Sequence, residues 1–369
     1  MAQFEIKDGV AIIPEGTTEI GYQAFYKCTL LESITIPDGV TKIGWDAFFS
    51  CTSLKSIIIP DSVTKIGMNA FSHCTSLECI TIPESVTVIG RGAFMGCTSL
   101  RSITLSEGVK TIEDSAFYGC TSLKNIVIPG SVTVIESKPF SDCTSLESIV
   151  VAEGNPIYDS HDNCNAIIET ATNTLIKGCS SPTSITIPSS VTSIRQFAFS
   201  RCSLLTSVFI PKNVTSIGEA AFSGCDSLTS IVVEDGNPIY DSRNNCNAII
   251  ETATNTLIQG CSSPTSFTIP SSVTSIGCGA FSGCYSLTNI VIPESVTSIK
   301  GHAFYGCSSL EIVHLPAGVS NFEIGSFKDC PNLKAIYAPK NKVDFYKEHF
   351  PADMRQLIVE EGADLPVKP

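Results

Sequence analysis

The segment CTSLKSIIIPDSVTKIGMNAFSH, residues 51–73, decides the fold, because close copies of it follow one another along most of the chain. A cysteine opens each copy, and two intervals of 36 residues interrupt a regular spacing of 23 residues. A period of about 20–29 residues with apolar positions tied to it is typical of a solenoid, in which each turn packs on the next. We therefore expect function to lie on an extended surface rather than in one pocket. Thirteen of the seventeen cysteines belong to these series: Cys28, Cys51, Cys74, Cys97, Cys120 and Cys143; Cys179, Cys202 and Cys225; Cys261, Cys284, Cys307 and Cys330.

The first half of the segment predicts a short strand. Leu54, Ile57 and Ile59 end in a period of two, which is the period of a half-buried strand. Ile57 and Ile59 should therefore face the core, whereas Ser56 and Ile58 should face outward.

The second half of the segment predicts the return of the chain. Pro60 ends the first strand because it has no N–H to donate. Val63 and Ile66 form a second, looser extended crossing, Gly67 permits a turn, and residues 70–71 suit one helical or 3₁₀ turn. One such unit cannot bury its apolar side chains alone, so neighbouring units must enclose the core.

Composition and charge narrow the possible partners. The chain has 369 residues, of which 43% are hydrophobic and 16% charged, with a net charge of −13 and a pI near 4.8. Nucleic-acid binding needs clustered Lys and Arg, so we exclude DNA and RNA as partners. No apolar run approaches the ~20 residues of a membrane span. The first residues, MAQFEIKDG, lack the features of a secretory signal, so we expect either a protein made without export or a chain whose leader has been removed.

The regular cysteines predict a buried ladder of free thiols. Neighbouring turns lie ~4.8 Å apart, but their side chains point in parallel, which does not favour disulfide bonds. Buried thiols act as small hydrophobic groups. No Cys-x-x-Cys occurs and no histidine shares the period, so we expect no zinc site.

The pattern C-x-x-L-x-x-I-x-I-P-x-x-V-x-x-I-G-x-x-A-F-x-x resembles the BspA-like leucine-rich repeat family over about residues 4–340. The resemblance implies an α/β-type repeat solenoid, a right-handed superhelix of about fourteen turns. Short parallel strands would line its concave face, and loops with 3₁₀ or short helical turns its convex face. Family members are reported to bind diverse partners, among them host extracellular-matrix proteins and other bacteria. The chain departs from the pattern at Ser106, at Pro139 and at residues 322–324.

We divide the chain into a solenoid over residues 1–340 and a C-terminal cap helix and tail over residues 341–369. Residues 1–28 form the N-terminal cap and first turn, in which Asp8-Gly9 predicts a hairpin. Residues 155–178 and 237–260 are near-duplicates, because the block 144–225 is copied at 226–307. Each should form a β-hairpin excursion projecting from the solenoid. At the C-terminus, residues 342–350 predict an amphipathic helix, and the tail beyond Glu360 should fray.

The sequence gives little evidence for a catalytic or metal site. His73, His161 and His302 stand where other repeats carry unrelated residues, which indicates exposed positions, and Asp159, Ser160 and His161 are too close in sequence to form a triad. We expect no enzyme, catalytic residue or cofactor. The loops containing Asp159, Asp162, Asn163 and Asn165, and Asp241, Asn244, Asn245 and Asn247, suit tight turns or, alternatively, Ca²⁺.

The strand residues that face away from the core form the candidate binding face. This face is flat and nearly uncharged, and most of its side chains are small. A parallel sheet favours such residues in any case, so the face could be purely structural. The residue directly before each outward strand is charged in the first half of the chain, with mostly alternating sign from turn to turn, and we call this series the charge ladder. In the second half the same position carries threonine. The charge ladder is Glu32, Lys55, Glu78, Arg101, Lys124 and Glu147, and the threonines are Thr206, Thr229 and Thr288. The candidate partner-binding residues are Ile58, Phe209, His314 and Tyr337 on this face, with Tyr158 and Tyr240 in the excursions.

These observations favour a non-enzymatic protein-interaction module, expected to be monomeric. By its family resemblance it would be a cell-surface or secreted adhesion protein whose partner is a host extracellular-matrix protein or another cell surface. Two alternatives stay open. One is an intracellular structural scaffold in the cytoplasm, consistent with free thiols. The other is a glycan-binding surface protein using aromatic residues near Tyr158 and Tyr240.

Overall fold

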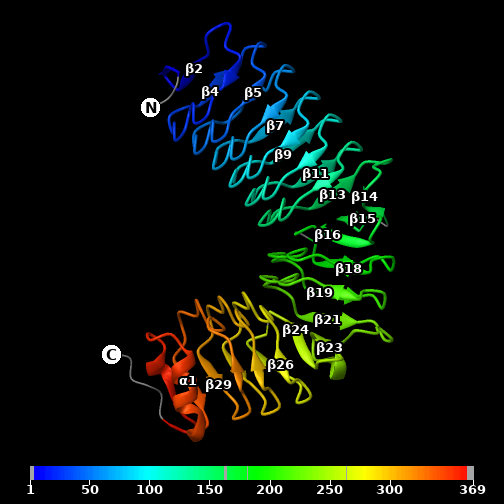
Figure 1. Cartoon of the computed structure of the whole chain (residues 1–369), viewed down its shortest axis with the longest axis vertical. Helices are drawn as coiled ribbons and strands as arrows, with labels where there is room; N and C mark the ends of the chain where they lie inside the picture. Colours follow the sequence, from blue (N-terminus) through cyan, green and yellow to red (C-terminus); the bar gives the residue numbers. More distant parts are fainter. Residues whose placement is uncertain (1–3, 162–163, 181, 263, 364–369) are drawn as a thin grey trace. The chain divides into compact units, whose positions relative to one another are not determined.

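The computed structural model describes residues 4–161, 164–180, 182–262 and 264–363, and the chain divides into two compact units, residues 1–181 and 182–369. Both units are stacks of parallel strands with little helix, and together they make about 15 turns (Figure 1). The parallel-strand solenoid is therefore confirmed. Calcium-loop residues Asp162 and Asn163 and the end of the predicted tail lie outside the described residues.

Unit 1 carries its outward strands in two parallel stacks. The turn at Ser56 joins the second stack through an isolated bridge to Cys79. An antiparallel hairpin, in which Ile6 pairs with Ala11, closes the first turn, as Asp8-Gly9 predicts. The hairpin is β1 (Ile6–Lys7) and β2 (Val10–Ile12), and the other outward strands are β4 (Ser33–Thr35), β7 (Cys79–Ile82), β9 (Ser102–Leu105), β11 (Asn125–Ile128) and β13 (Ser148–Val151).

The second crossing of unit 1 is a six-stranded parallel sheet of two-residue strands. Its apolar positions are buried in every turn; Val63 and Ile66, for example, are fully inaccessible to solvent. Both predicted crossings are thus present. The strands are β3 (Glu19–Ile20), β5 (Lys42–Ile43), β6 (Lys65–Ile66), β8 (Val88–Ile89), β10 (Thr111–Ile112) and β12 (Val134–Ile135).

Unit 2 repeats this arrangement. Its outward strands are β17 (Ser184–Thr186), β19 (Ser207–Ile210), β21 (Ser230–Val233), β25 (Ser266–Thr268), β27 (Asn289–Val291), β29 (Ile312–His314) and β31 (Ala335–Ala338). Its second crossing contains β18 (Ser193–Ile194), β20 (Ser216–Ile217), β26 (Ser275–Ile276), β28 (Ser298–Ile299) and β30 (Asn321–Phe322).

The corner after the second crossing is not helical, which corrects the expected helical or 3₁₀ turn. Asn69 and His73 have left-handed backbones, with φ of 53° and 58°. Alternate N–H groups leave the turn altogether: the Phe71 N–H donates to the Ala93 carbonyl of the next turn at 2.7 Å, whereas the Ser72 N–H bonds within the corner. The two left-handed residues exclude a continuous helical turn, whose residues would all have φ near −60°. His73 is exposed as predicted, but its position is constrained, because left-handed backbone favours Gly, Asn, Asp or His.

Gly67 opens the predicted turn, since the Ala70 N–H donates to its carbonyl at 3.3 Å, and it has a second role as well. Its φ is not left-handed, and a Cβ added there would lie 2.8 Å from the carbonyl carbon of Gly44 and 2.7 Å from the Trp45 ring. The glycine therefore also allows two turns to approach closely.

Equivalent residues of successive turns stack on one another in the core, and the phenylalanines form the largest such column of unit 1. In unit 1 the Phe rings of successive corners are nearly parallel, with centroids 5.1 to 5.6 Å apart. The cysteines lie beside them as free thiols, and the Cys97 Sγ–H donates to the Phe71 carbonyl at 3.1 Å. From Cys51 to Cys143, each thiol of the ladder therefore fills space and gives a buried carbonyl of an earlier turn a second hydrogen bond. The stacked residues are Phe25, Phe48, Phe71, Phe94, Phe117 and Phe140.

Both long turns form the predicted hairpins, but the hairpins do not project. In unit 2 the second strand of the hairpin, β24, pairs in parallel with β26 of the next turn. The hairpin thus occupies the position that the second crossing has in an ordinary turn. Ile249, Ile250 and Leu257 are fully buried. The strands are β14 (Tyr158–Asp159), β15 (Ala166–Glu169) and β16 (Thr174–Gly178) in unit 1, and β22 (Tyr240–Asp241), β23 (Ala248–Glu251) and β24 (Thr256–Gly260) in unit 2. A short 3₁₀ helix, η2 (Arg243–Asn245), lies between β22 and β23.

The predicted C-terminal helix is present as α1 (Val343–His349), after η3 (Lys340–Lys342). Tyr346 is fully buried, and its hydroxyl donates to the Pro316 carbonyl at 2.7 Å. The chain then adds η4 (Arg355–Leu357) and a strand that the sequence did not indicate, β32 (Ile358–Glu360), which pairs in parallel with β31. This last strand covers the sheet edge that β31 would otherwise expose.

Candidate binding surface

The outward strand face of unit 1 is a strip of small, uncharged side chains. In β7 and β9, Cys79 stands opposite Ser102 and Thr81 opposite Thr104, and all four side chains are exposed, while the alternate residues are buried. Ile58 is 83% exposed, which confirms its predicted outward direction. Because the backbone of a parallel sheet is already paired, only these side chains are available to a partner.

A groove of about 780 Å³ lies over this strip. Ile58 and Thr81 form part of its floor, and two acidic residues, Asp61 and Glu84, stand at the ends of the strands where the chain turns. The sequence analysis singled out the floor but not these acids. The remaining lining residues are Ser56, Ile57, Ile59, Cys79, Ile80, Pro83, Ser85, Ser102, Thr104 and Ser106.

At the opposite ends of the strands, the predicted charge ladder is present as ion pairs. Lys55 and Glu32 approach to 3.3 Å, Lys124 and Glu147 to 3.4 Å, and Arg101 and Glu78 to 3.9 Å. These side chains are more than half exposed, so each pair contributes only about 0.2–1 kcal/mol. The ladder leaves this margin of the face electrically balanced.

In unit 2 the same margin carries the predicted hydroxyl ladder. The Thr206 Oγ1–H donates to the Thr183 carbonyl at 2.8 Å, and Thr229 and Thr288 make the equivalent bonds at 3.0 and 2.9 Å. Phe209 is 46% exposed on β19 and, with Val232, borders a hollow of about 650 Å³ beside the loop 234–245. Phe209 is therefore positioned as an apolar contact residue.

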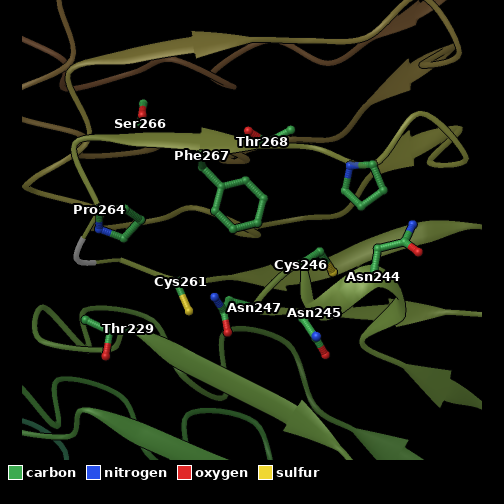
Figure 2. Close-up of a pocket in the computed structure, with 11 residues that line it drawn as sticks. Thr229, Asn244, Asn245, Cys246, Asn247, Cys261, Pro264, Ser266, Phe267 and Thr268 are labelled. Carbon is green, nitrogen blue, oxygen red and sulfur yellow. The ribbon is translucent and has the colours of Figure 1, made fainter.

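A second hollow of unit 2, of about 500 Å³, lies between η2 and β25. Figure 2 shows Asn244, Asn245 and Asn247 on one side, with Phe267 on the strand opposite and Cys261 below it. The amides provide neutral donors and acceptors, which suits a polar, uncharged ligand group rather than an ion.

The asparagine loop itself has the character of a turn. Asn244, Asn245 and Asn247 all have left-handed φ values, between 52° and 60°. The one carboxylate of the loop, Asp241, is held by Arg243 at 2.8 Å. Of the two interpretations left open by the sequence, this geometry supports the tight turn.

The predicted contact residues Tyr158 and Tyr240 are buried, with exposed fractions of 5% and 7%. The Tyr240 hydroxyl accepts a hydrogen bond from the Ile217 N–H at 3.2 Å, and burial raises the pKa of this phenol. Asn237 holds the tyrosine in place by accepting from its N–H at 2.8 Å. These tyrosines therefore pack against the preceding turn and are not accessible to a partner.

The comparisons with known proteins agree with this architecture. The family described as BspA type leucine rich repeat region, in six copies, matches residues 18–147, 160–250 and 251–354. The chain belongs to this family. A search of curated proteins found no match.

Solved structures of similar proteins are bacterial leucine-rich repeat proteins. A leucine rich cell surface protein from Faecalibacterium prausnitzii is 31% identical, with a TM-score of 0.58 over 91% of this chain and 87% of that chain. The pneumococcal vaccine antigen PcpA is 23% identical, with a TM-score of 0.58 over 90% of this chain and 80% of that chain. The second likeness shows the fold alone.

Leucine-rich repeats are typically non-enzymatic, and the one candidate triad of this BspA-type chain is not assembled. The His161 Nδ1 lies 2.6 Å from the Asp159 carboxylate, but the Ser160 hydroxyl accepts from the Val151 N–H at 3.0 Å. Among the described residues, no group of three or more His, Cys, Asp or Glu side chains could hold a metal ion, and no helix is long and apolar enough to cross a membrane.

His314 and Tyr337, the last two predicted contact residues, lie side by side near the C-terminal cap of the repeat stack. Their rings stack at 5.0 Å, and the Glu361 carboxylate lies 3.0 Å from the His314 Nδ1. Both rings are half-buried. Sequence reasoning missed two strongly exposed aromatic residues, Tyr22 and Trp45, although their 23-residue spacing after Ile-Gly could have indicated them.

Proposed function

We propose that this chain is a protein-recognition module of a cell-surface or secreted adhesion protein, which binds its partner, as a monomer, through the outward strand face. The observation that supports this most directly is the exposure of apolar side chains on a sheet face that is otherwise flat. Ile58, Val127 and Phe209 stand outward there, at 83%, 54% and 46% exposure. Val127 stands opposite the exposed Val150, and Phe209 opposite the exposed Val232, so apolar side chains of neighbouring turns meet on the face, as is typical of interaction surfaces.

The cell-surface location is proposed from the family and from the F. prausnitzii protein, which is described as a cell surface protein. A host extracellular-matrix protein or another cell surface is the expected partner class. Small outward side chains leave room for a partner's bulkier groups, and Phe209 supplies an aromatic anchor of the kind that dominates binding energy.

The test uses surface plasmon resonance of the full chain against immobilised fibronectin, laminin and collagen. Thr81→Arg and Phe209→Arg place a bulky charge on the face in units 1 and 2, and at least one should weaken binding about tenfold or more. Thr87→Arg is the matched control. Thr87 is exposed in the same turn as Thr81, but it lies directly before β8 of the second crossing and therefore outside the outward strand face. Binding that neither face variant weakens, or no binding to any of the three proteins, would contradict the proposal.

A further inference from the structure

One charged feature of unit 1 is accounted for only in part by the fold. Five consecutive turns carry an acidic residue at the same place, directly after the proline that ends the outward strand or after Ser106 in its stead. All five side chains are exposed. We call this series the acidic row: Glu15, Asp38, Asp61, Glu84 and Glu107.

The acidic row holds like charges in register. Ile82 pairs with Leu105 in β7 and β9, so Glu84 and Glu107, two residues further on, also stand opposite each other about one strand spacing, ~4.8 Å, apart. Like charges directly opposite are destabilising. Among the described residues no member of the row forms an ion pair, in contrast to the ladder at the other margin, where signs mostly alternate.

The fold does not require an acid at this position. In unit 2 the residue that follows the strand's proline is a serine, a lysine, a glutamate or an alanine, and those turns have the same conformation of two crossings and a corner. Glu107 does support the next turn, since its carboxylate accepts from the Gly130 and Ser131 N–H groups at 3.3 and 3.1 Å. Among the described residues the other four acids of the row make no such bond, so they serve something other than packing. The unit 2 residues are Ser189, Lys212, Ser271, Glu294 and Ala317.

The row and the outward strand face form one surface. Asp61 and Glu84 line the groove of about 780 Å³ together with Ile58 and Thr81. The groove thus has an uncharged floor and one negative margin. The wider field has the same sign, since unit 1 has 20 acidic and 11 basic residues, a net charge of −9, against −4 for unit 2.

We infer that this groove binds an extended polypeptide segment rich in lysine or arginine, with its cationic side chains facing the acidic row. The inference rests on the proposed function and gives the chemistry of the partner in unit 1. A chain lying on the small floor residues brings its basic groups to the row, which removes the like-charge repulsion and steers association. The row suits a divalent cation less well, because Ca²⁺ needs six to eight converging oxygens and these carboxylates follow a line.

The test measures fluorescence anisotropy of a labelled twelve-residue peptide of alternating Lys and Ser, titrated with the full chain at 50 mM and 200 mM NaCl. Neutralising the row with Asp61→Asn and Glu84→Gln should weaken binding about tenfold and reduce its salt dependence. The control double variant, Asp235→Asn with Glu294→Gln in unit 2, removes the same charge and should change affinity less than twofold. Thr81→Arg should also weaken binding, because it fills the groove and repels the peptide.

Three results would overturn the inference: no binding of the basic peptide, equal losses in the row and control variants, or unchanged affinity in the row variant. The second would indicate diffuse attraction to a chain of net charge −13. Thermal unfolding of each variant checks the fold, and the row variant should unfold no earlier than the parent chain.

Failure of the inference and failure of the proposed function give different results. If Thr81→Arg abolishes binding to a matrix protein while the row variant does not, the strand face binds a partner whose chemistry is not basic. If the basic peptide binds the row, but neither Thr81→Arg nor Phe209→Arg weakens binding to any matrix protein, the inference holds and the proposed adhesion to matrix proteins fails.

Discussion

The buried thiols make the protein sensitive to alkaline pH. Burial raises the pKa of Cys51, Cys97, Cys261 and Cys284 from 9.0 to about 12. Above pH 9 the unfolded chain releases these protons while the native chain retains them. The stabilisation is therefore fully present below pH 9 and is lost as the pH rises towards 12.

The loss can be estimated for each unit. One thiol with this shift lowers the free energy of unfolding by about 1.4 kcal/mol per pH unit, and each unit contains two of the four, so each loses about 2.7 kcal/mol per pH unit. Over two pH units this is about 5 kcal/mol, comparable with the 5–15 kcal/mol stability of an ordinary domain. We expect cooperative unfolding between about pH 10 and 11.5.

Circular dichroism from pH 7 to 12 measures this transition, and urea unfolding at several pH values gives its slope. A Cys97→Ala variant, compared with the parent chain at each pH, should reduce the slope of unit 1 by about 1.4 kcal/mol per pH unit. A free energy of unfolding that stays constant from pH 8 to 10.5 would refute the reasoning.

Thiol reactivity tests the same burial independently. With a chromogenic disulfide reagent at pH 8, exposed Cys79 should react first, and Cys278 more slowly, since burial and then the Glu219 carboxylate raise its pKa to about 11. Cys28 and Cys246 are half-buried, and the thirteen buried thiols should react only after denaturation. Cys79→Ser should remove the fast phase. Fewer than seventeen thiols in the denatured, unreduced chain would reveal disulfide bonds and contradict the free ladder.

Three further substitutions test the packing, each measured as the free energy of urea unfolding. Phe71→Ala removes a fully buried ring from the stack and should cost about 3–5 kcal/mol; a cost below 1 kcal/mol would show that the stack collapses around the gap. Tyr240→Phe leaves the Ile217 N–H without its acceptor and should cost about 1–3 kcal/mol, whereas a neutral result would mean that water replaces the hydroxyl. Gly260→Ala places a Cβ 2.2 Å from the Phe281 ring and should cost about 1–3 kcal/mol, and a stabilised variant would exclude this contact.

The regular part of the fold was predictable because each turn repeats the same local pattern. The inward direction of Ile57 and Ile59, the outward direction of Ile58 and the free thiol of Cys51 all follow from period and spacing, and the structure confirms them. The corner was predicted wrongly, because local spacing cannot show that the Phe71 N–H bonds to the next turn. That hydrogen bond is a property of the stack and not of one repeat.

The long turns illustrate the same limit. Their strand-forming residues predicted a hairpin correctly, but its burial depends on the parallel pairing of β24 with β26, a turn further along the chain. Tyr240 appeared to be a surface aromatic for this reason. Its hydroxyl instead meets the Ile217 N–H, 23 residues earlier, and this contact becomes apparent only when the two turns are stacked.

A repeat protein contains an internal comparison that separates structural from functional residues. A motif present in both units and engaged in contacts, such as Asn237 and Tyr240 with their copies Asn155 and Tyr158, is explained by packing. An acid repeated in five consecutive turns of unit 1, replaced by Gly130 in the next turn and mixed in unit 2, is not explained by packing where it forms neither an ion pair nor a hydrogen bond among the described residues. Of the acidic row this holds for all members but Glu107, which accepts from two N–H groups of the next turn. Because repulsion within the row opposes folding while the same position tolerates Ser, Lys or Ala elsewhere, selection for a basic partner accounts for it better than selection for stability.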